Sequence, residues 1–462
     1  MAENDGLDRL KETKLTRRQF MIRATLAGLF TTAGAGILSA CSSGQPSPAA
    51  TKAPAAAAPT TAPAAAAATA APKAGGQITV LVASDKAWVP GLIKKFESDS
   101  GIKVNPVIVD WNDLGTKFTV AAAGGSSTYD VVDVDPSAHG SFMKAGYLEP
   151  LDSYLAPVKS DLVNPSIFSY GGKIYGMPWF TDALFFFYNK DMLDKAGFSA
   201  APTTWDELRT QALAIQQKGI SKYPFAFEWK QIEGEFDLYM TFLFGNGGKL
   251  LDESLSKPLF NSPEGVAALQ FLRDLYAKDK LVDPGSFNMR PLEVMTEMAQ
   301  GRAAYAIIWG EVAGGVNDPA KSQVVGKIGS AVIPVAKAGN PSWTVDGSEC
   351  LAIPAKSANK EAAWKFIQYF TSKEQSKAIF KEMSALPVWK SVFDDPELAK
   401  NPWMKTFLDQ LKNDYSRPGQ SWYGEFSQTM QVETINALNG SKSPQQALDD
   451  AAKKAADILK KG

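Results

Sequence analysis

Tryptophans and carboxylates recur where the predicted strands end or pass into loops. The tryptophans of this kind are Trp88, Trp111, Trp179, Trp229, Trp309, Trp343 and Trp422. Carboxylates stand near several of them, namely Asp85, Asp135, Asp182 and Glu311. Flat rings can cover the apolar C–H faces of a pyranose, while carboxylates accept hydrogen bonds from its hydroxyl groups. Each tryptophan alone also fits a partly buried core position, but together they favour a site for a polyhydroxylated ligand.

Other kinds of chemistry have less support in the sequence. His139 is the only histidine, which excludes histidine-based triads and His-rich metal sites, although a lysine base or carboxylate chemistry remains open. The glycines at 245–248 lack the Lys-Ser/Thr of a phosphate loop and fit a helix end and turn. With 48 basic and 49 acidic residues and no Lys/Arg-rich run, the chain does not favour nucleic acid. We expect no metal, no cofactor and no catalysis.

The first 75 residues are typical of export and tethering. Basic residues precede the small, apolar stretch 24–40, which predicts a signal peptide over residues 1–40 and is too short for a confident membrane span. The segment 16–20 (TRRQF) resembles a twin-arginine export signal, and 38–41 (LSAC) resembles a lipobox, which would place a lipid on Cys41. The alternative is an ordinary secretory peptide with a chance cysteine. Residues 41–75, rich in Ala, Pro and Thr, predict a disordered tether.

The remaining residues, 76–462, are enough for two domains of α/β type. Apolar runs and helical periodicity predict alternating strands and helices at the start of this region, at 77–82, 89–100, 102–110, 114–123 and 129–135. This order implies a parallel sheet with right-handed crossovers. Ligands bind beyond the carboxyl ends of such strands, which here carry 85–88, 110–111 and 133–137. Later segments are mostly helical, with further strands at 303–309 and 328–334.

The stretch 171–206 combines a turn, an aromatic-rich strand and the start of a helix at Trp205. Its polar interruption, 179–182 (WFTD), places an aromatic ring next to a carboxylate. We predict that this stretch crosses between two lobes, with ligand held at the crossing. The bulky run 184–187 (LFFF) is then expected to be core of the second lobe.

Several motifs in order resemble the extracellular solute-binding proteins of ABC importers, and within them the sugar-binding group that includes the maltose-binding protein. They are GGKIYGMPW, DALFFFYNKDML, TTWDEL, GRAAYAIIWG and ECLAIPAKSANKEAAWKFIQYFTSKEQ, followed by Ala385-Leu386-Pro387. The resemblance implies a two-lobed periplasmic-binding-protein fold with hinge strands near 180–184 and 341–347. Lobe one would comprise 76–181 and 346–391, and lobe two 185–341 and 392–462.

The resemblance also implies roles for individual residues. Asp182 aligns with a sugar-hydroxyl acceptor, Asp85-Lys86 with a ligand-contacting pair, and Trp309 with a stacking tryptophan. Glu228-Trp229 approximates an acidic-aromatic contact, whereas Trp422-Tyr423 lies several residues ahead of the C-terminal stacking position. The full set of predicted ligand-binding residues is Asp85, Lys86, Trp88, Asp135, Ser137, Trp179, Asp182, Trp229, Trp309, Glu311, Trp343, Asp346 and Trp422.

The leading hypothesis is a lipid-anchored, monomeric receptor on the outer face of the cytoplasmic membrane. It would capture a mono- or oligosaccharide between two closing lobes and deliver it to an ABC permease. The same fold could instead bind a polyol, a sugar phosphate or a peptide, although the absence of an arginine cluster disfavours anionic ligands. Two alternatives remain. One is a surface glycosidase that uses Asp182 and Glu311, and the other is a structural adhesin.

Overall fold

The computed structural model describes residues 76–83, 89–125 and 128–461, which belong to one compact unit. The predictions made for residues 1–75, including Cys41, and for Asp85, Lys86 and Trp88 lie outside the described residues. Among the helices of the described part, none combines the length and apolar character that a membrane crossing requires.

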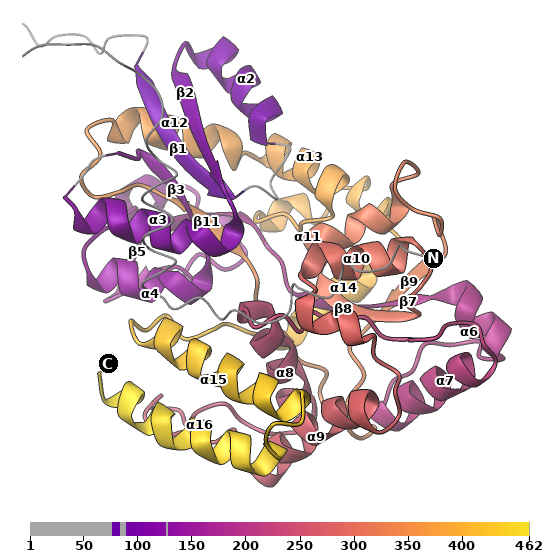
Figure 1. Cartoon of the computed structure of the whole chain (residues 1–462). Coiled ribbons are helices and arrows are strands. Elements are labelled where there is room, and N and C mark those ends of the chain that lie inside the picture. Colours follow the sequence, from indigo (N-terminus) through magenta and orange to yellow (C-terminus); the bar gives the residue numbers. More distant parts are fainter. Residues whose placement is uncertain (1–75, 84–88, 126–127, 462) are drawn as a thin grey trace, which may run out of the picture. The chain divides into compact units, whose positions relative to one another are not determined.

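A five-stranded sheet lies at the amino-terminal end of the described chain (Figure 1). Its strands are, in spatial order, β2 (Lys103–Val109), β1 (Gln77–Ala83), β3 (Val131–Val134), β11 (Glu349–Ala352) and β6 (Gly176–Phe180). β1 is parallel to both β2 and β3, as predicted from the alternation of strands and helices. β11 returns from far along the chain and pairs antiparallel with β3 and β6, so the sheet is mixed.

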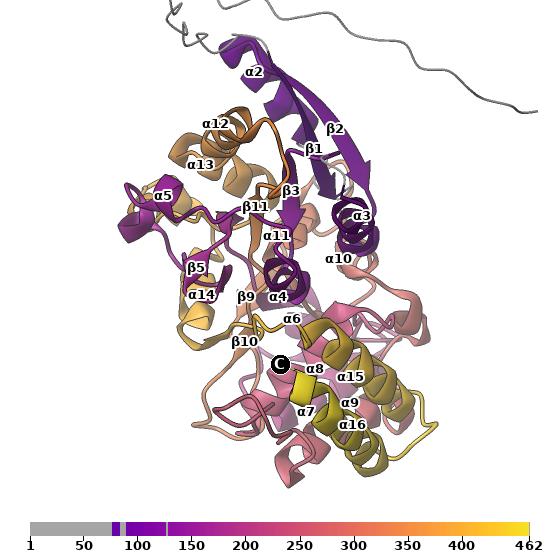
Figure 2. The ribbon, with the colours of Figure 1, turned by 90° about the vertical axis from the view of Figure 1, so that its left-hand side faces the viewer.

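Helices cover both faces of this sheet. Ile78, Val80 and Val82 face one way and pack in a cluster with α2 (Val89–Ser100) and α12 (Lys360–Phe370). Leu81 faces the other way, toward α3 (Trp111–Ala123) and α4 (Pro136–Lys144). This alternation follows from the two-residue period of a strand. Figure 2 shows α12 and α13 (Lys373–Met383) on one side of β1 and β3, and α3 on the other.

A second, three-stranded sheet has the order β8 (Tyr305–Trp309), β7 (Leu184–Asn189), β9 (Ile328–Ala331), with both pairs antiparallel. The central strand β7 contains the apolar run 184–187, whose side chains are at most 1% exposed, so the expectation that this run is core is confirmed. Leu184 and Phe186 pack with the helices that follow, while Phe185 and Phe187 face the opposite side. Both faces of β7 are therefore covered, which explains a run of four apolar residues without alternation.

The second sheet is surrounded mainly by helices. They are α6 (Lys190–Ala196), α7 (Trp205–Gln217), α8 (Glu233–Gly245), α9 (Pro263–Ala277), α10 (Pro291–Ala299), α11 (Gly310–Ala313), α14 (Met404–Gln410), α15 (Tyr423–Leu438) and α16 (Pro444–Ile458). α7 begins where the sequence predicts, because Thr204 and Glu207 form a reciprocal capping box. Every residue of α8 is buried, because β10 (Thr344–Val345) and the helices α9 and α15 pack around it.

Two extended linking segments lie between strands of different sheets. The first, residues 181–183, joins β6 of the five-stranded sheet to β7 of the three-stranded sheet. The second, residues 346–348, joins β10, which pairs with β12 (Asp414–Tyr415) in a separate two-stranded sheet, to β11. The segments are bonded to each other, since the Gly347 N–H donates to the Asp182 carbonyl at 2.8 Å. The first segment also pairs with Leu386, whose N–H donates to the Thr181 carbonyl at 2.9 Å. The first segment lies within the range 180–184 predicted for one crossing, and the second overlaps the range 341–347 predicted for the other at residues 346–347. That these segments are hinges between two lobes stays a prediction, as do the lobe boundaries.

The carboxy-terminal part of the chain is attached to β7 through α14. Phe407 is 0% exposed, and its ring centroid lies 4.1 Å from that of Phe185. Replacing it by alanine, as Phe407→Ala, should reduce the free energy of unfolding by about 3–5 kcal/mol, because a large buried ring is lost and a cavity remains. Chemical denaturation measures this change. The adjacent Leu408, 40% exposed, is the matched control, and Leu408→Ala should change stability by no more than about 0.5 kcal/mol. Equal effects of the two substitutions would contradict this packing.

Candidate functional site

A cavity of about 250 Å³ lies where the two sheets meet the start of α8. Its wall combines residues after β2 and β3, residues of the linking segments, the first turns of α8 and α10, and the end of β8. The carboxyl ends of β2 and β3 therefore contribute to the cavity, as expected for parallel strands. The corresponding end of β1 lies outside the described residues.

Four of the predicted site residues line this cavity: Asp135, Asp182, Trp309 and Glu311. They come from the end of β3, the first linking segment, the end of β8 and the start of α11. The structure thus brings together side chains that are up to 176 positions apart in the chain. Their predicted roles as ligand contacts stay predictions.

Asp182 is held in place by backbone donors. Its Oδ1 accepts from the N–H groups of Ala183 at 2.8 Å and Gly310 at 2.9 Å, and its Oδ2 accepts from Glu311 N–H at 3.2 Å. Burial, and next the charge of Glu311, raises the pKa of Asp182 well above its usual range, although the three donors oppose this rise. The carboxyl group therefore ties the first linking segment to the start of α11, in addition to lining the cavity.

Trp309 presents its indole ring to the cavity because of a close contact with a glycine. A Cβ atom at Gly347 would lie 2.3 Å from Cζ3 of Trp309, so only glycine leaves room for this ring. Gly347 belongs to the second linking segment, and it also lines the cavity. The position of the aromatic ring is thus coupled to the second linking segment.

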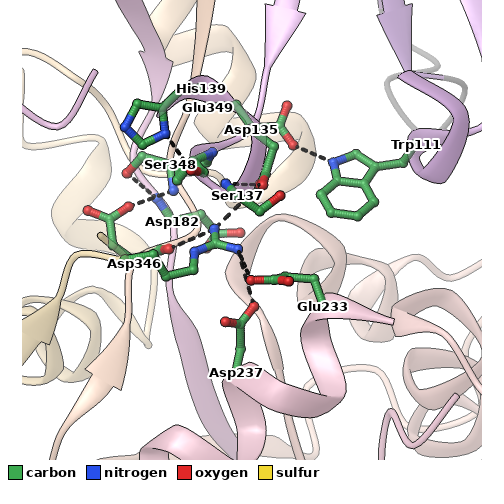
Figure 3. Close-up of polar contacts among 12 residues, drawn as sticks. Trp111, Asp135, Ser137, His139, Asp182, Glu233, Asp237, Asp346, Ser348 and Glu349 are labelled. Carbon is green, nitrogen blue, oxygen red and sulfur yellow. Dashed lines mark hydrogen bonds and ion pairs between the residues drawn. The ribbon is translucent and has the colours of Figure 1, made fainter. Parts of the chain in front are cut away.

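Arg417, in the loop before α15, is the main cation of the cavity wall. Its Nη1 lies 3.3 Å from Oε1 of Glu233 and 3.4 Å from Oδ2 of Asp237, and its Nη2 lies 3.4 Å from Oδ2 of Asp135. Nη2 also donates to the carbonyl of Asp346 at 3.0 Å. Figure 3 shows Glu233 and Asp237 extending from the same helix toward Asp135. Arg417 therefore bridges the end of β3, the start of α8 and the second linking segment.

Two further contacts complete the wall near β2. The indole Nε1 of Trp111 donates to Oε1 of Glu349 at 3.0 Å. Asp110 caps α3 and pairs with Arg290, whose Nη1 lies 2.7 Å away. Hydrogen bonds from Asn112 and then from Arg290 lower the pKa of Asp110 to about 2, so it is ionised at neutral pH. The Asp110–Arg290 pair joins the edge of the first sheet to α10.

Glu228 also lines the cavity, where it is 3% exposed. Burial raises the pKa of its carboxyl group to about 8, and a hydrogen bond from the Trp309 side chain partly opposes this shift. A Cβ atom at Gly234 would lie 2.3 Å from Oε2 of Glu228, so the carboxyl group is packed directly against the backbone of α8. Sequence similarity indicated the pair Glu228-Trp229, and the structure places Glu228 at the cavity.

The remaining predicted residues lie elsewhere. Trp229 is 1% exposed and packs against Phe227 and Phe287, because neighbours in an extended segment face opposite ways. Trp179 is also in the core, where its Nε1 donates to Oδ1 of Asp133 at 3.1 Å. Strand β6 is buried throughout, which leaves this ring no path to the cavity.

Trp343 packs near Phe244, and Trp422 packs against Phe426, so neither ring reaches the cavity. Asp346 is 1% exposed and accepts from the Ser348 N–H at 2.7 Å, so it stabilises the second linking segment from behind the cavity wall. Ser137 lies in the first turn of α4, where its N–H donates to Asp135 at 2.7 Å. It lines an adjoining hollow of about 700 Å³ that shares Asp135 and Trp111 with the cavity.

Sequence reasoning missed Glu233, Asp237, Arg290, Glu349 and Arg417, and it named Trp111 and Glu228 without including them among the predicted ligand-binding residues. Trp111 had a usable signal, since it belongs to the tryptophans at strand ends. Arg417 had none, because it is a single basic residue in a loop. Within the described part of the chain, no group of three or more His, Cys, Asp or Glu side chains is arranged to hold a metal ion.

Known proteins resemble the chain in both sequence and structure. The profile of the bacterial extracellular solute-binding proteins matches residues 48–377. A maltose-bound MalE3 of T. maritima superposes with a TM-score of 0.78 at 28% identity, covering 83% of this chain and 100% of that chain. An ABC transporter solute-binding protein of Agrobacterium radiobacter K84 in complex with ribitol superposes with a TM-score of 0.75 at 27% identity. This match covers 84% of this chain and 100% of that chain.

A relative from Deinococcus radiodurans, described as a probable ABC transporter-binding protein, is 28% identical over 300 residues. The match covers 63% of this chain and 70% of the relative. The mixed helix and strand architecture agrees with the two-lobed periplasmic-binding-protein fold predicted from the sequence. The family profile spans more than half of the residues of this chain. The chain therefore belongs to the bacterial extracellular solute-binding proteins, which bind ligands and are not enzymes.

Proposed function

We propose that this protein captures a sugar or polyol in the cavity between its two sheets and delivers it to the permease of an ABC importer. The observation that carries the proposal is the joint presence of the Trp309 indole and several carboxylates on one cavity wall. It is supported by the maltose in the T. maritima structure and the ribitol in the Agrobacterium structure. The excess of carboxylates over cations also disfavours a sugar phosphate.

The chemistry of the wall suits such a ligand. Burying apolar C–H groups against an indole ring contributes about 25 cal/mol per Å², and a hydrogen bond to a charged group contributes about 1.5–3 kcal/mol. A few such contacts reach about −8 kcal/mol, which corresponds to micromolar affinity, after the cost of association. The cavity, about 250 Å³, lies just below the usual range of about 300–1,000 Å³ for small-molecule sites. A ligand of one or two rings fits best, and the adjoining hollow gives space for a longer one.

The proposed movement is closure of two lobes around the crossings at 180–184 and 341–347. Lobe one comprises 76–181 and 346–391, and lobe two comprises 185–341 and 392–462. Two ion pairs, Asp110–Arg290 and Asp135–Arg417, connect residues of lobe one to residues of lobe two. Contacts of this kind change when lobes close, so they couple ligand binding to the hinge.

We also propose a lipid anchor on Cys41, with residues 1–40 as signal peptide and 41–75 as tether. The support is the segment 38–41, LSAC, after a small and apolar stretch, followed by residues rich in Ala and Pro. The protein would then lie on the outer face of the cytoplasmic membrane, within reach of its permease, where we propose that it acts as a monomer.

The role of Trp309 can be tested by calorimetry after a thermal-shift screen of sugars and polyols has identified a ligand. A ligand at 100 times its Kd adds about 2.7 kcal/mol of stability, so the screen is sensitive. Trp309→Ala should weaken binding at least tenfold, about 1.4 kcal/mol, because the stacking surface is lost. Asp182→Ala should have a similar effect, because its carboxyl group holds the first linking segment and the start of α11 together at the cavity wall.

The matched control is Trp343→Ala, which removes a partly buried tryptophan that does not line the cavity. Its affinity should stay within about twofold of the parent protein. Unchanged affinity for both Trp309→Ala and Asp182→Ala would contradict the assignment of the site.

The lipid anchor predicts a change in location. Cys41→Ser should move the protein from the membrane fraction of expressing cells to the soluble exported fraction, because the acceptor for the lipid is removed. Immunoblots of the separated fractions measure this change, and mass spectrometry of the parent protein detects the lipid directly. Cys350→Ser is the control, since Cys350 is buried in the folded protein. A parent protein found only in the soluble fraction would contradict the anchor.

A further inference from the structure

The cavity wall carries a large excess of carboxyl groups over cationic groups. Among the described residues that line it, nine are Asp or Glu and two are Arg, with no Lys. Arg290 is paired with Asp110, and Arg417 is shared among three carboxylates. Residues 84–88 lie outside the described residues, and among them Asp85 and Lys86 are one acidic and one basic residue. The two guanidinium groups therefore leave several carboxyl groups of the wall without a cationic partner.

Glu228 is the carboxylate that lacks compensation most clearly. It is 3% exposed, it lines the cavity, and its Oε2 has no hydrogen-bond partner. Asp237 repeats the pattern, since it is 0% exposed and its Oδ1 has no hydrogen-bond partner. Removing such a group from water costs several kcal/mol unless a partner replaces the lost hydration. Both side chains therefore indicate a partner that the protein itself does not supply.

The charged groups around Glu228 do not provide that partner. α8 contributes Asp237 and Glu235, whose pKa values burial raises well above their usual range, so neither supplies a positive charge. α10 contributes Glu293, which raises the pKa of Glu228, and Arg290, which lowers it. These two contributions from α10 oppose each other, and burial remains the largest influence, raising the pKa to about 8. An empty cavity thus favours the protonated form of Glu228 at neutral pH, whereas a cation beside it would favour the ionised form.

A neutral sugar would leave these carboxyl groups without a cation. Hydroxyl groups can donate hydrogen bonds to carboxyl groups, but they carry no charge that would stabilise the ionised forms of the buried Glu228 and Asp237. Asp182 already accepts three backbone N–H groups, so its remaining capacity for ligand hydroxyls is small. A protonated amine supplies up to three donors and a full positive charge in one group.

We propose that the ligand is a cationic carbohydrate or polyol, with a protonated amine bound between Glu228 and Asp237 and the sugar ring against Trp309. This inference rests on the proposed function and names its substrate class as amino sugars, their short oligomers or amino polyols. The Glu228 carboxyl group is packed directly against the Gly234 backbone. The amine therefore meets a preformed acceptor.

The test compares matched ligands by calorimetry with the full-length protein at pH 7.5. The amines are glucosamine, galactosamine, mannosamine, the β-1,4-linked glucosamine disaccharide and 1-amino-1-deoxysorbitol. Each is measured beside its parent neutral compound and, for the hexosamines, its N-acetyl derivative. At least one amine should bind tenfold or more tightly than both neutral counterparts. In Glu228→Gln this preference should fall below about threefold, because the amide has the same shape and no charge.

Glu235→Gln is the matched control. Glu235 is 1% exposed and accepts from the Thr434 hydroxyl group at 2.8 Å, and it does not line the cavity. The same chemical change at this site should leave the preference for the amine intact. A preference that survives in Glu228→Gln, or is lost equally in Glu235→Gln, would overturn the assignment to Glu228.

The pH dependence gives a second readout. Because the pKa of Glu228 is about 8 in the free protein, binding of a cation below that pH requires loss of a proton. The affinity for the amine should therefore fall by up to tenfold for each pH unit from about 7.5 to 5.5, while the affinity for neutral sugars changes little. Glu228→Gln should remove this dependence.

The two proposals fail in different ways. Neutral sugars or polyols that bind at least as tightly as their amines would overturn the cationic ligand and leave the sugar-binding function standing. Absence of binding by every sugar and polyol, charged or neutral, would contradict the proposed function itself. Putrescine, a diamine without hydroxyl groups, should bind at least tenfold more weakly than the best amino sugar, and equal binding would overturn the carbohydrate part of the inference.

Discussion

The buried guanidinium of Arg417 is the interaction on which the site depends most. Its side chain is 1% exposed and lies between carboxylates from the end of β3 and from the start of α8, with a backbone carbonyl of the second linking segment. Burying an ion costs several kcal/mol unless partners compensate it, and removing one partner of such a group leaves the others uncompensated. The four elements that meet here are thus held in one arrangement, and the cavity wall follows from it.

Much of the fold could be predicted because its signals are local. Hydrophobic periodicity, the Thr204 to Glu207 capping box and the glycine after the first helix define elements within a few residues of one another. The pairing of β11 with β3 and β6 could not be predicted in this way. Those strands lie about 170 residues or more from β11 in sequence, and their own residues do not specify which strand pairs with which. The buried helix α8 contains apolar and acidic residues but has no distinct polar face. The sequence therefore could not predict which elements pack around it.

The site was predictable only in part, for a related reason. Asp135, Asp182, Trp309 and Glu311 stand at the ends of strands or in linking segments, positions that sequence patterns locate well. Which way a side chain faces is decided by packing. Glu228 and Trp229 are neighbours, yet one lines the cavity and the other is core. Arg417 lies far along the chain, in a loop without a pattern, so its contacts arise only in the folded protein.

The carboxylates of the cavity oppose folding while the cavity is empty, and this is consistent with a binding role. Asp182, Glu228 and Asp237 each have a pKa raised by burial, which means that their ionised forms are destabilised in the folded protein. A large core around both sheets offsets this cost, since β7 alone buries three phenylalanine rings. The folded protein therefore tolerates buried hydrogen-bond acceptors that lack partners. A ligand that supplies the missing donors and charge binds these acceptors where they already stand, so binding does not have to bring them into position. Preorganised acceptors of this kind favour selectivity. A ligand without the matching donor leaves them unpaired, and its binding affinity is lower for that reason.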